Sequence, residues 1–452
     1  MPYVPNTDDQ RREMLAAIGV KSFEDLLDSI PAETRVGQIR IPSGLSEMET
    51  LGKMHELASR TQVFAPERMF AGAGIYSHYI PPLVTQLSTR SEFFTAYTPY
   101  QPEVSQGLLQ TIFEYQTYAC ELSGLEVSNA SSYDGATACA DAVNIARCAT
   151  RRKRVIFSPN VHPHNRGVFE TYNIGWKMDV LDLPYSSNSF AIDSGSLSSL
   201  LSGKDIAVVV VQYPNFYGCF ESGLSGLAEL CHKYGTLLAV GYYPFVSGWV
   251  KRPGDLGCDI AFAEGQSLGI PMGYGGPGLG MLTVRKDYVR FLPGRLIGKT
   301  SDANGKTAYV MTLQAREQHI RRDKANSSIC TNSALLALTA TIYLSGIGKH
   351  GFREVGRLSS AAAHKLAEML AGISGISLAF PGVPFFNEFT IDIDHSKPMD
   401  LFERLMGRGI LPGVPLSRFG CSERRWLVAT TEQHSEADIA YFVSAIAEEV
   451  SK

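Results

Sequence analysis

The chain has 452 residues, of which 44% are hydrophobic and 19% charged, a composition typical of a soluble globular protein with a large core. Its 45 acidic and 41 basic residues give a net charge of −4, which argues against a nucleic-acid-binding or membrane-surface protein. The eight cysteines are scattered without a CxxC motif, and the N-terminal stretch MPYVPNTDDQRREML lacks the apolar core of a signal peptide. No apolar run approaches the roughly 20 residues of a membrane helix. We therefore expect a cytoplasmic protein that binds neither nucleic acid nor a membrane.

Residues 1–60 are predicted to form an N-terminal helical arm. Helix start signals occur at Thr7, Ser22 and Ser46, the last of them in a capping-box pattern, and prolines separate the three segments. The apolar residues of these segments gather on one face. We expect that face to pack on the main body of the protein or on a partner subunit.

The next segment, residues 70–107, is rich in Tyr, Pro, Gly and Ser and has little helical or strand periodicity. A long irregular segment within an enzyme-sized domain is usually functional or interfacial, although a plain surface loop remains an alternative. Its centre, Ala96–Glu103, places hydroxyl and amide groups between two rigid prolines. A strong amphipathic helix is predicted over residues 103–122, with Gly124 as its stop.

A helix built from small residues is predicted to begin after Asp134. The backbone amides and the dipole at its N-terminus would suit a phosphate group. Asp134 is itself a good N-cap residue and would compete for the same amides. Both readings, a phosphate site and an ordinary capped helix, stay open at this point.

Strands and helices alternate from residue 155 onward, and the apolar run within 205–215 is typical of a strand buried on both faces. This alternation predicts a mostly parallel sheet in a large α/β domain over residues 61–325. Ligands of such sheets bind at the carboxyl ends of the strands. Here those ends are predicted at Gln212–Asn215, Tyr242–Tyr243 and Glu264–Gln266.

A smaller α+β C-terminal domain is predicted over residues 326–452. The stretch Leu313–Ser345 is interpreted as a long helix with one interruption. Helix, strand, helix, strand and helix then follow one another within about 100 residues, as is typical of a compact α+β unit. No internal repeat is found.

Two motifs look functional by their letters and are interpreted otherwise. The stretch Gly273–Gly278 matches GxGxxG, but it contains a proline and leads into a strand, whereas a dinucleotide-binding loop opens a helix. His162 and His164 lie two residues apart on a predicted turn, with no nearby carboxylate or cysteine cluster to complete a metal site. We expect no metal. Neither the GxSxG motif of hydrolases nor a P-loop is present.

The stretch Asp259–Arg285 predicts a strand, a glycine-rich loop and a return strand, which together form a pocket floor. Enzymes of the aspartate aminotransferase fold place a lysine at this position, where it forms a Schiff base with pyridoxal phosphate, and an acid on the preceding strand. This chain has Gln266 in place of the lysine, and Gly241, Tyr242 and Tyr243 in place of the acid. The nearest lysines, Lys251, Lys286 and Lys299, are poorly placed. We predict a pyridoxal-phosphate-transferase-like fold of type I without catalytic or cofactor-binding residues of its own.

Several long stretches of the chain resemble one family: FAGAGIYSHYIPPLV, ASSYDGATACADA, AEGQSLGIPMGYGGPGLG and FFNEFTIDI. They closely resemble the alpha subunit, or subunit 1, of glycine dehydrogenase (decarboxylating). That enzyme is the P-protein of the glycine cleavage system in its two-gene form. The resemblance covers essentially the whole chain.

The resemblance implies an assembly of two alpha and two beta chains. In that family the beta chain carries the lysine and holds pyridoxal phosphate. The complex decarboxylates glycine and passes the aminomethyl group to the lipoyl arm of H-protein. Gln266 at the lysine position fits the alpha-chain pattern, whereas Tyr243 departs from the aspartate that similar alpha chains often carry.

This chain is then expected to complete the active site of its partner. The polar, proline-braced loop is the best candidate for that role, and the arm together with the charged run 316–324 is expected to form the interface. Two alternatives remain, namely a self-sufficient pyridoxal-phosphate transferase that uses another lysine and a scaffold or regulatory pseudoenzyme unrelated to glycine. The residues expected to line the partner's site are Tyr97, Tyr100, Gln101, Glu103 and Gln106, with Tyr76, His78 and Tyr79 behind them.

Overall fold

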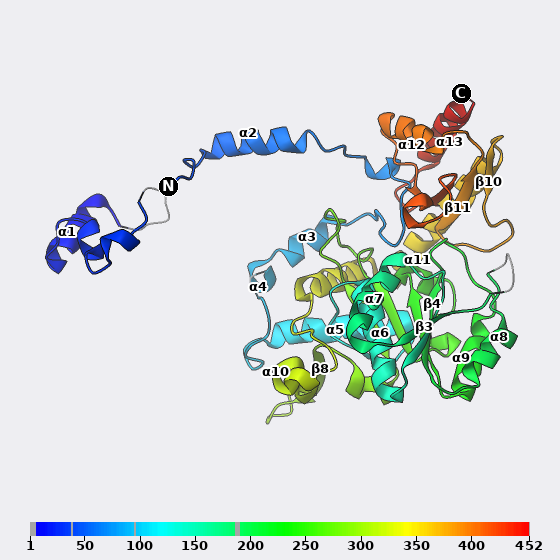
Figure 1. Cartoon of the computed structure of the whole chain (residues 1–452), viewed down its shortest axis with the longest axis horizontal. Helices are drawn as coiled ribbons and strands as arrows, with labels where there is room; N and C mark the ends of the chain where they lie inside the picture. The colour runs from blue at the N-terminus through cyan, green and yellow to red at the C-terminus, as the bar shows by residue number, and fades with distance from the viewer. Residues whose placement is uncertain (1–5, 38, 95, 186–189, 452) are drawn as a thin grey trace. The chain divides into compact units, whose positions relative to one another are not determined.

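The computed structural model describes residues 6–37, 39–94, 96–185 and 190–451. These residues form two units, Met1–Val63 and Phe64–Lys452, and each is described by itself (Figure 1). The first unit contains the predicted arm. The predicted division of the remainder at residue 325 stays a prediction.

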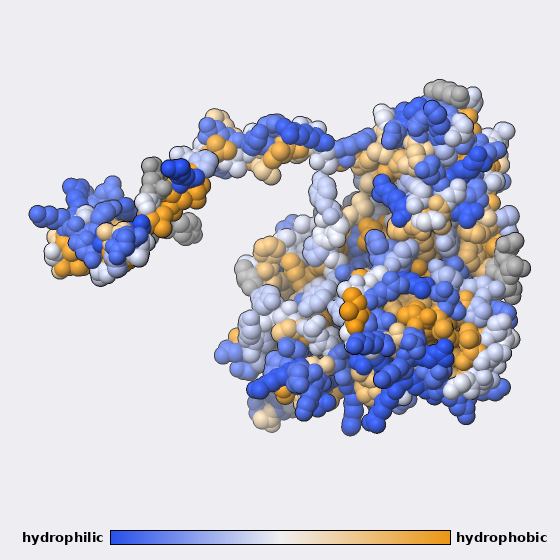
Figure 2. Space-filling model, viewed as in Figure 1, coloured by the Kyte–Doolittle hydropathy of each residue, from blue (hydrophilic) through white to orange (hydrophobic). Residues whose placement is uncertain are grey.

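Two α-helices of the arm begin at the predicted residues. Helix α1 (Asp8–Ile18) is capped by Thr7 and helix α2 (Glu47–Ala58) by Ser46, and each N-terminus forms a complete capping box. The third signal produces only a 3₁₀ turn, η1 (Glu24–Leu27). Neither α-helix contains a buried residue, so apolar side chains lie on the surface of this unit (Figure 2). The most exposed of them are Ile18, Phe23, Val36, Ile39, Ile41, Leu45, Met48, Leu51, Met54 and Val63.

The segment predicted to be irregular contains two short helices, α3 (Pro82–Ser88) and α4 (Ser91–Phe94), so the prediction is wrong for that part. Pro82 stands in the first turn of α3, where its missing N–H costs nothing. Helix α5 runs over Gln106–Ser123 and ends at Gly124 in the left-handed conformation, as predicted. It begins later than residue 103, and Val104 lies in the preceding turn with 76% of its surface exposed.

A seven-stranded sheet forms the centre of the second unit, in the order β1-β7-β6-β5-β4-β2-β3. The pairs from β3 to β6 are parallel, whereas β1 and β7 run antiparallel to their neighbours, which confirms the predicted mostly parallel sheet. The strands are β1 (Val127–Ser128), β2 (Arg154–Phe157), β3 (Asp179–Asp182), β4 (Ile206–Tyr213), β5 (Leu237–Tyr242), β6 (Ile260–Glu264) and β7 (Gly280–Val284).

Helices cover both faces of this sheet. Along β4, Val208 and Val210 face a core formed with α6 and α7, whereas Val209 and Val211 face a core formed with α5, α8, α9 and α11. This alternation is the reason that the whole strand is apolar. The bounds of these helices are α6 (Gly135–Thr150), α7 (Pro163–Trp176), α8 (Ser194–Leu201), α9 (Leu224–Lys233) and α11 (Ala334–Ala371).

Asp141 of α6 is a buried carboxyl group, only 1% exposed. Ser327 bonds to it, but its Oδ2 atom has no hydrogen-bond partner among the described residues, and burial raises its pKa to about 7. The folded protein therefore holds a proton that the unfolded chain releases at lower pH, and this group's contribution to stability falls as pH rises from about 4 to about 7.

We expect Asp141→Asn to increase the free energy of unfolding at pH 8, by on the order of 2–4 kcal/mol, because the amide carries no charge. The variant should also lose the slope of stability against pH that this carboxyl causes. Urea denaturation at pH 5 and pH 8 measures both effects. Asp179→Asn, at an exposed carboxyl on β3, is the control and should change neither value. A variant equally destabilised at both pH values would contradict the prediction.

The chain between β7 and α11 differs from the sequence interpretation. It contains an unpredicted hairpin, β8 (Leu296–Ser301) and β9 (Thr307–Thr312), followed by short turns that include α10 (Gln318–Arg321). The long helix predicted from Leu313 begins only at Ala334. Its interruption is at Gly348, whose φ of +59° breaks the helical geometry. The remaining 3₁₀ turns of the chain are η2 (Ala32–Thr34), η3 (Pro66–Arg68), η4 (Pro244–Gly248), η5 (Gly254–Leu256), η6 (Lys286–Phe291), η7 (Gln314–Arg316), η8 (Arg322–Lys324) and η9 (Leu416–Phe419).

An antiparallel sheet in the order β10-β11-β13-β12 forms the C-terminal part of the second unit. Trp426 and Phe442 are among its fully buried side chains, in a core shared with the C-terminal half of α11. None of the described helices is long and apolar enough to cross a membrane. The elements are β10 (Ile376–Leu378), β11 (Glu388–Ile393), α12 (Pro398–Gly407), β12 (Val414–Pro415), β13 (Arg425–Ala429) and α13 (Glu436–Val450).

Candidate functional site

A pocket of about 470 Å³ lies at the carboxyl ends of β4, β5 and β6. The predicted strand-end residues line it, including Gln212, Asn215, Tyr243, Glu264 and Gln266. The C-terminal sheet contributes Glu388, and the segment after the arm contributes Ala73–Tyr76. This pocket therefore lies at the strand ends where the sequence predicts a ligand site.

Gln266, at the position where the sequence analysis expects the lysine of this fold, is buried, and both polar atoms of its carboxamide are hydrogen-bonded. Its Oε1 accepts a hydrogen bond from the backbone N–H of Tyr76 at 3.0 Å, and its Nε2 donates to the carbonyl of Ile270 at 2.7 Å. A carboxamide cannot condense with an aldehyde. In this chain it instead fixes the backbone of the segment that crosses the pocket.

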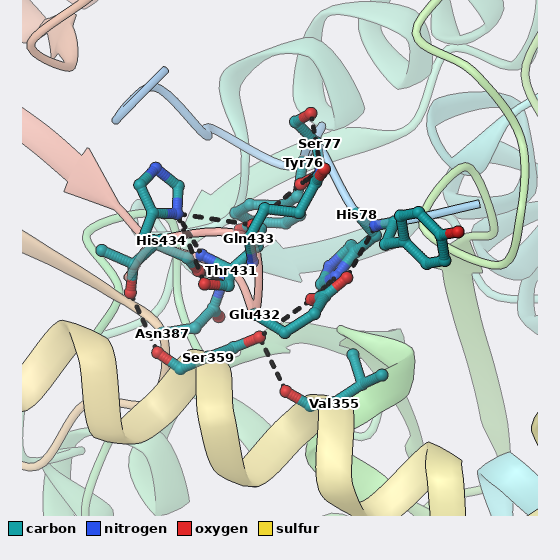
Figure 3. A network of polar contacts seen from close by, with 12 residues as sticks. Tyr76, Ser77, His78, Val355, Ser359, Asn387, Thr431, Glu432, Gln433 and His434 are labelled. Atoms are coloured by element: carbon teal, nitrogen blue, oxygen red, sulfur yellow. Dashed lines mark hydrogen bonds and ion pairs between the residues drawn. The ribbon is translucent and has the colours of Figure 1, made fainter. Parts of the chain in front are cut away.

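Tyr243, near the position expected for the acid, bonds to the same segment. Its hydroxyl lies 2.5 Å from Nε2 of His78, and Nδ1 of His78 lies 2.6 Å from Oε2 of Glu432. Figure 3 shows Glu432 between His78 and Ser359 of α11, with Tyr76 close by. The rings of Tyr76 and Tyr243 are in contact, with centroids 4.7 Å apart.

Further bonds attach the same segment to the C-terminal sheet. Glu388 accepts hydrogen bonds from the N–H of Ala73 at 2.6 Å and from the hydroxyl of Tyr76 at 2.9 Å. Burial raises the pKa of Glu388 to about 7. Thr431 and Gln433 both donate to the carbonyl of Ser77. The segment is thus held from both the seven-stranded sheet and the C-terminal part of the second unit.

His162 is part of this attachment. Its Nε2 lies 2.9 Å from the carbonyl of Ala73, and its Nδ1 accepts the N–H of His164 at 3.0 Å. Burial lowers its pKa to about 4, which keeps the ring neutral. Among the residues that the structure describes, no three His, Cys, Asp or Glu side chains form a group that could hold a metal ion.

Two carboxylates occupy the N-terminus of helix α6. Asp134 accepts the N–H of Thr137 at 2.7 Å, and Glu264 accepts the N–H of Gly135 at 2.8 Å. The sequence left open whether this end is an ordinary capped helix or a phosphate site. The structure shows an N-cap at Asp134 and adds the second carboxylate, which the sequence did not predict.

The pocket does not fit pyridoxal phosphate. Its lining, as far as the structure describes it, contains three carboxyl groups, those of Asp134, Glu264 and Glu388, and neither a lysine nor an arginine. The nearby Lys251, Lys286 and Lys299 are exposed and lie outside it. No amine is therefore available for the aldehyde, and two carboxyl groups already occupy the helix N-terminus that would bind an ester phosphate.

The residues expected to line a partner's site fall into two groups. Tyr76 and His78 are buried at or beside the pocket, whereas Tyr79 is 55% exposed and bonds Glu432 through its N–H. Four residues of the loop are exposed, and Gln106 is half-buried, where its amide bonds the backbone of Tyr309. The exposed loop residues are Tyr97, Tyr100, Gln101 and Glu103.

Sequence reasoning missed Glu388 and Glu432 as members of the site. They lie 312 and 354 residues from Tyr76 and His78, their respective partners, so no local spacing connects them. The only sequence signal was that each carboxylate lies at one end of a predicted apolar strand.

The fold and the pocket define a member of the pyridoxal-phosphate-transferase-like class, fold type I. A C-DES mutant, solved with glycine covalently linked to its PLP cofactor, shares this fold with a TM-score of 0.62 at 13% identity, over 85% of this chain and 97% of that one. At such low identity the likeness shows the fold alone.

The whole chain matches one family. The model of the glycine cleavage system P-protein family matches residues 1–446, and the chain belongs to this family. It is 46% identical over 450 residues to a probable glycine dehydrogenase (decarboxylating) subunit 1 of Desulfitobacterium hafniense, which covers 99% of this chain and 100% of that protein. It is also similar to the inhibitor-bound crystal structure of glycine decarboxylase (P-protein) of the glycine cleavage system. That similarity has a TM-score of 0.88 at 42% identity, over 99% of this chain and 100% of the other.

Proposed function

We propose that this chain is the cofactor-free alpha subunit of a two-chain glycine decarboxylase. With a beta subunit it decarboxylates glycine and transfers the aminomethyl group to the lipoyl arm of H-protein. The beta subunit holds pyridoxal phosphate, which serves as the electron sink of the decarboxylation. Two alpha and two beta chains form the complex, and its location is the cytoplasm.

One observation supports the proposal that the partner, and not this chain, holds the cofactor. Gln266 is at the position expected for the lysine, and both polar atoms of its carboxamide are hydrogen-bonded inside the pocket. Gln266 is buried, so a lysine at a neighbouring position could not take over its place in the pocket. The name "subunit 1" of the Desulfitobacterium hafniense relative, which matches over its full length, supports a second subunit. The exposed apolar residues of the arm offer the surface on which that subunit would dock.

The loop 96–106 is our candidate for the part that enters the partner's site. Tyr97 and Tyr100 are 68% and 76% exposed, although aromatic rings are more often covered. The base of the loop is fixed, because Gln106 bonds the backbone of Tyr309 and Arg295 bonds Thr98. A rigid base with exposed aromatic and amide groups is typical of a surface that positions a ligand across an interface.

We expect Tyr100→Ala and Gln101→Ala each to lower glycine–bicarbonate exchange by the reconstituted complex at least about tenfold, which corresponds to one lost positioning contact. The complex itself should stay intact in size-exclusion chromatography. Gln110→Ala, at an exposed glutamine on α5, is the matched control and should retain full exchange. Unchanged exchange in both loop variants would remove this role from the loop.

Two alternatives give different results in simple experiments. A self-sufficient transferase would turn yellow with pyridoxal phosphate when this chain is expressed alone, and borohydride would bleach it. A scaffold unrelated to glycine would neither co-purify with a beta-type chain nor support its exchange activity. Co-expression followed by co-purification and the exchange assay therefore tests the proposal as a whole.

A further inference from the structure

Glu264 lies at the end of β6 and joins three separate segments of the backbone. Its carboxylate accepts N–H groups from Gly135 at 2.8 Å, from Gln266 at 3.0 Å and from Leu279 at 2.9 Å. These donors belong to the first residue of α6, the loop after β6 and the residue before β7. Converging backbone N–H groups of this kind form an anion-binding cradle.

The backbone is packed closely around this carboxylate. A Cβ atom at Gly135 would lie 2.9 Å from the backbone nitrogen of Glu264. A Cβ atom at Gly278 would lie 2.9 Å from Cβ of Asp134 and 3.1 Å from Oε2 of Glu264. Two glycines therefore bring the helix N-terminus and the glycine-rich loop against the two carboxylates. This contact accounts for the glycine at position 278 of the stretch Gly273–Gly278.

The backbone N–H groups around Glu264 and the charges of the pocket lining together determine which ligand the site accepts. A phosphate ester bound at a helix N-terminus needs free N–H groups and benefits from the helix dipole or from a lysine or arginine. Here Glu264 and Asp134 already use the N–H groups of Gly135 and Thr137. No lysine or arginine lies among the described residues of the pocket lining.

We propose that Glu264 excludes phosphorylated aldehydes from this chain independently of the missing lysine, because its carboxylate is an anion that takes up the backbone N–H groups an ester phosphate would need. The side chain acts as an internal anion that completes the cradle. Restoring an amine alone would then not restore binding of the cofactor. This inference rests on the proposed function only for the statement that the partner holds pyridoxal phosphate.

The test uses the full chain without a partner, so that failure of the proposed assembly cannot affect the result. Gln266→Lys supplies an amine, which condenses with the aldehyde and releases water. Binding of pyridoxal phosphate and of pyridoxal, which lacks the phosphate, is followed by visible absorbance and by mass spectrometry after borohydride reduction. We expect Gln266→Lys to bind pyridoxal phosphate at least about tenfold more weakly than pyridoxal.

Removing the internal charge should change only the response to phosphate. Gln266→Lys/Glu264→Gln is expected to bind pyridoxal phosphate at least about tenfold more tightly than pyridoxal. This is the gain expected when the phosphate forms charge-assisted hydrogen bonds with the freed backbone N–H groups. Glu264→Gln keeps an oxygen that accepts backbone N–H groups, and Glu264→Ser in the same background provides a second variant. Gln266→Lys/Glu388→Gln is the matched control, because it neutralises another buried carboxyl group of the same pocket.

The proposal is overturned by any of three results. Gln266→Lys alone binds pyridoxal phosphate as tightly as pyridoxal or more tightly, the folded double variants show no preference for pyridoxal phosphate, or the Glu388 control gains that preference equally. Equal tightening towards pyridoxal and pyridoxal phosphate would show that Glu264 limits space and not charge, and would likewise contradict it.

Discussion

Leu51→Asp/Met54→Asp is expected to abolish co-purification of this chain with the proposed beta subunit. The two side chains are 54% and 58% exposed and lie one turn apart on α2, a helix without any buried residue. Covering each of them in an interface would contribute about 1.5–3 kcal/mol. Aspartates at the same positions would be buried without a partner, which costs several kcal/mol more. The dissociation constant should therefore rise more than about a thousandfold.

Sedimentation equilibrium of the mixed subunits measures this effect directly. The control is Thr50→Asp/Lys53→Asp, which places two aspartates at the same spacing on the polar side of α2. That variant breaks the ion pair between Lys53 and Glu56, but an exposed pair of this kind contributes at most about 1 kcal/mol. It should assemble normally. Equal loss of assembly in both variants would mean that helix charge, and not the apolar face, controls docking.

Gly218→Ala is expected to lower the free energy of unfolding by about 3–5 kcal/mol. Gly218 has a φ of +84° in the loop after β4, and a Cβ atom there would overlap the carbonyl group of Glu388 in β11. Both sides of this contact are backbone and cannot move apart independently. The same loop is bonded to the C-terminal sheet, since Thr390 donates to the carbonyl of Tyr217 at 3.0 Å and Phe220 donates to that of Pro384 at 2.8 Å.

Gly223→Ala separates the two causes of the lost stability, namely the strain of a positive φ and the overlap with neighbouring backbone. Gly223 has a similar φ of +92°, but the nearest atom to its Cβ would be that of Ile192 at 3.8 Å. The control should therefore cost only the strain of the backbone conformation, about 1–2 kcal/mol. Urea denaturation followed by tryptophan fluorescence measures both variants. Equal losses would show that the close approach of the two sheets contributes nothing.

The sequence predicted the parts of the fold that have strong periodicity. The apolar run of β4 was recognisable because both faces of the strand are buried, and Thr7 and Ser46 began helices because their caps are local. The strands β10 and β12 were missed because two or three residues carry no measurable period. The region after Leu313 was misread because its charged residues have helical spacing while the chain forms only short turns.

The site was predictable only in position. Strand order placed Gln266 and Tyr243 at one edge of the sheet, and chemistry excluded an amine there. The bonding partners of the segment after the arm lie several hundred residues away in the chain. The role of Glu264 depends on a close approach of three backbone segments, which no local pattern records.

The three-donor contact of Glu264 also bears on how this chain would respond to the supply of pyridoxal phosphate. A protein that binds a dissociable ligand gains stability by mass action, so its melting temperature rises with ligand concentration. A carboxylate carried on the chain is present at full occupancy as soon as the chain folds, and it cannot be diluted away. Glu264 therefore stabilises this fold at any concentration of pyridoxal phosphate, whereas in the proposed complex only the beta subunit would gain stability from the cofactor.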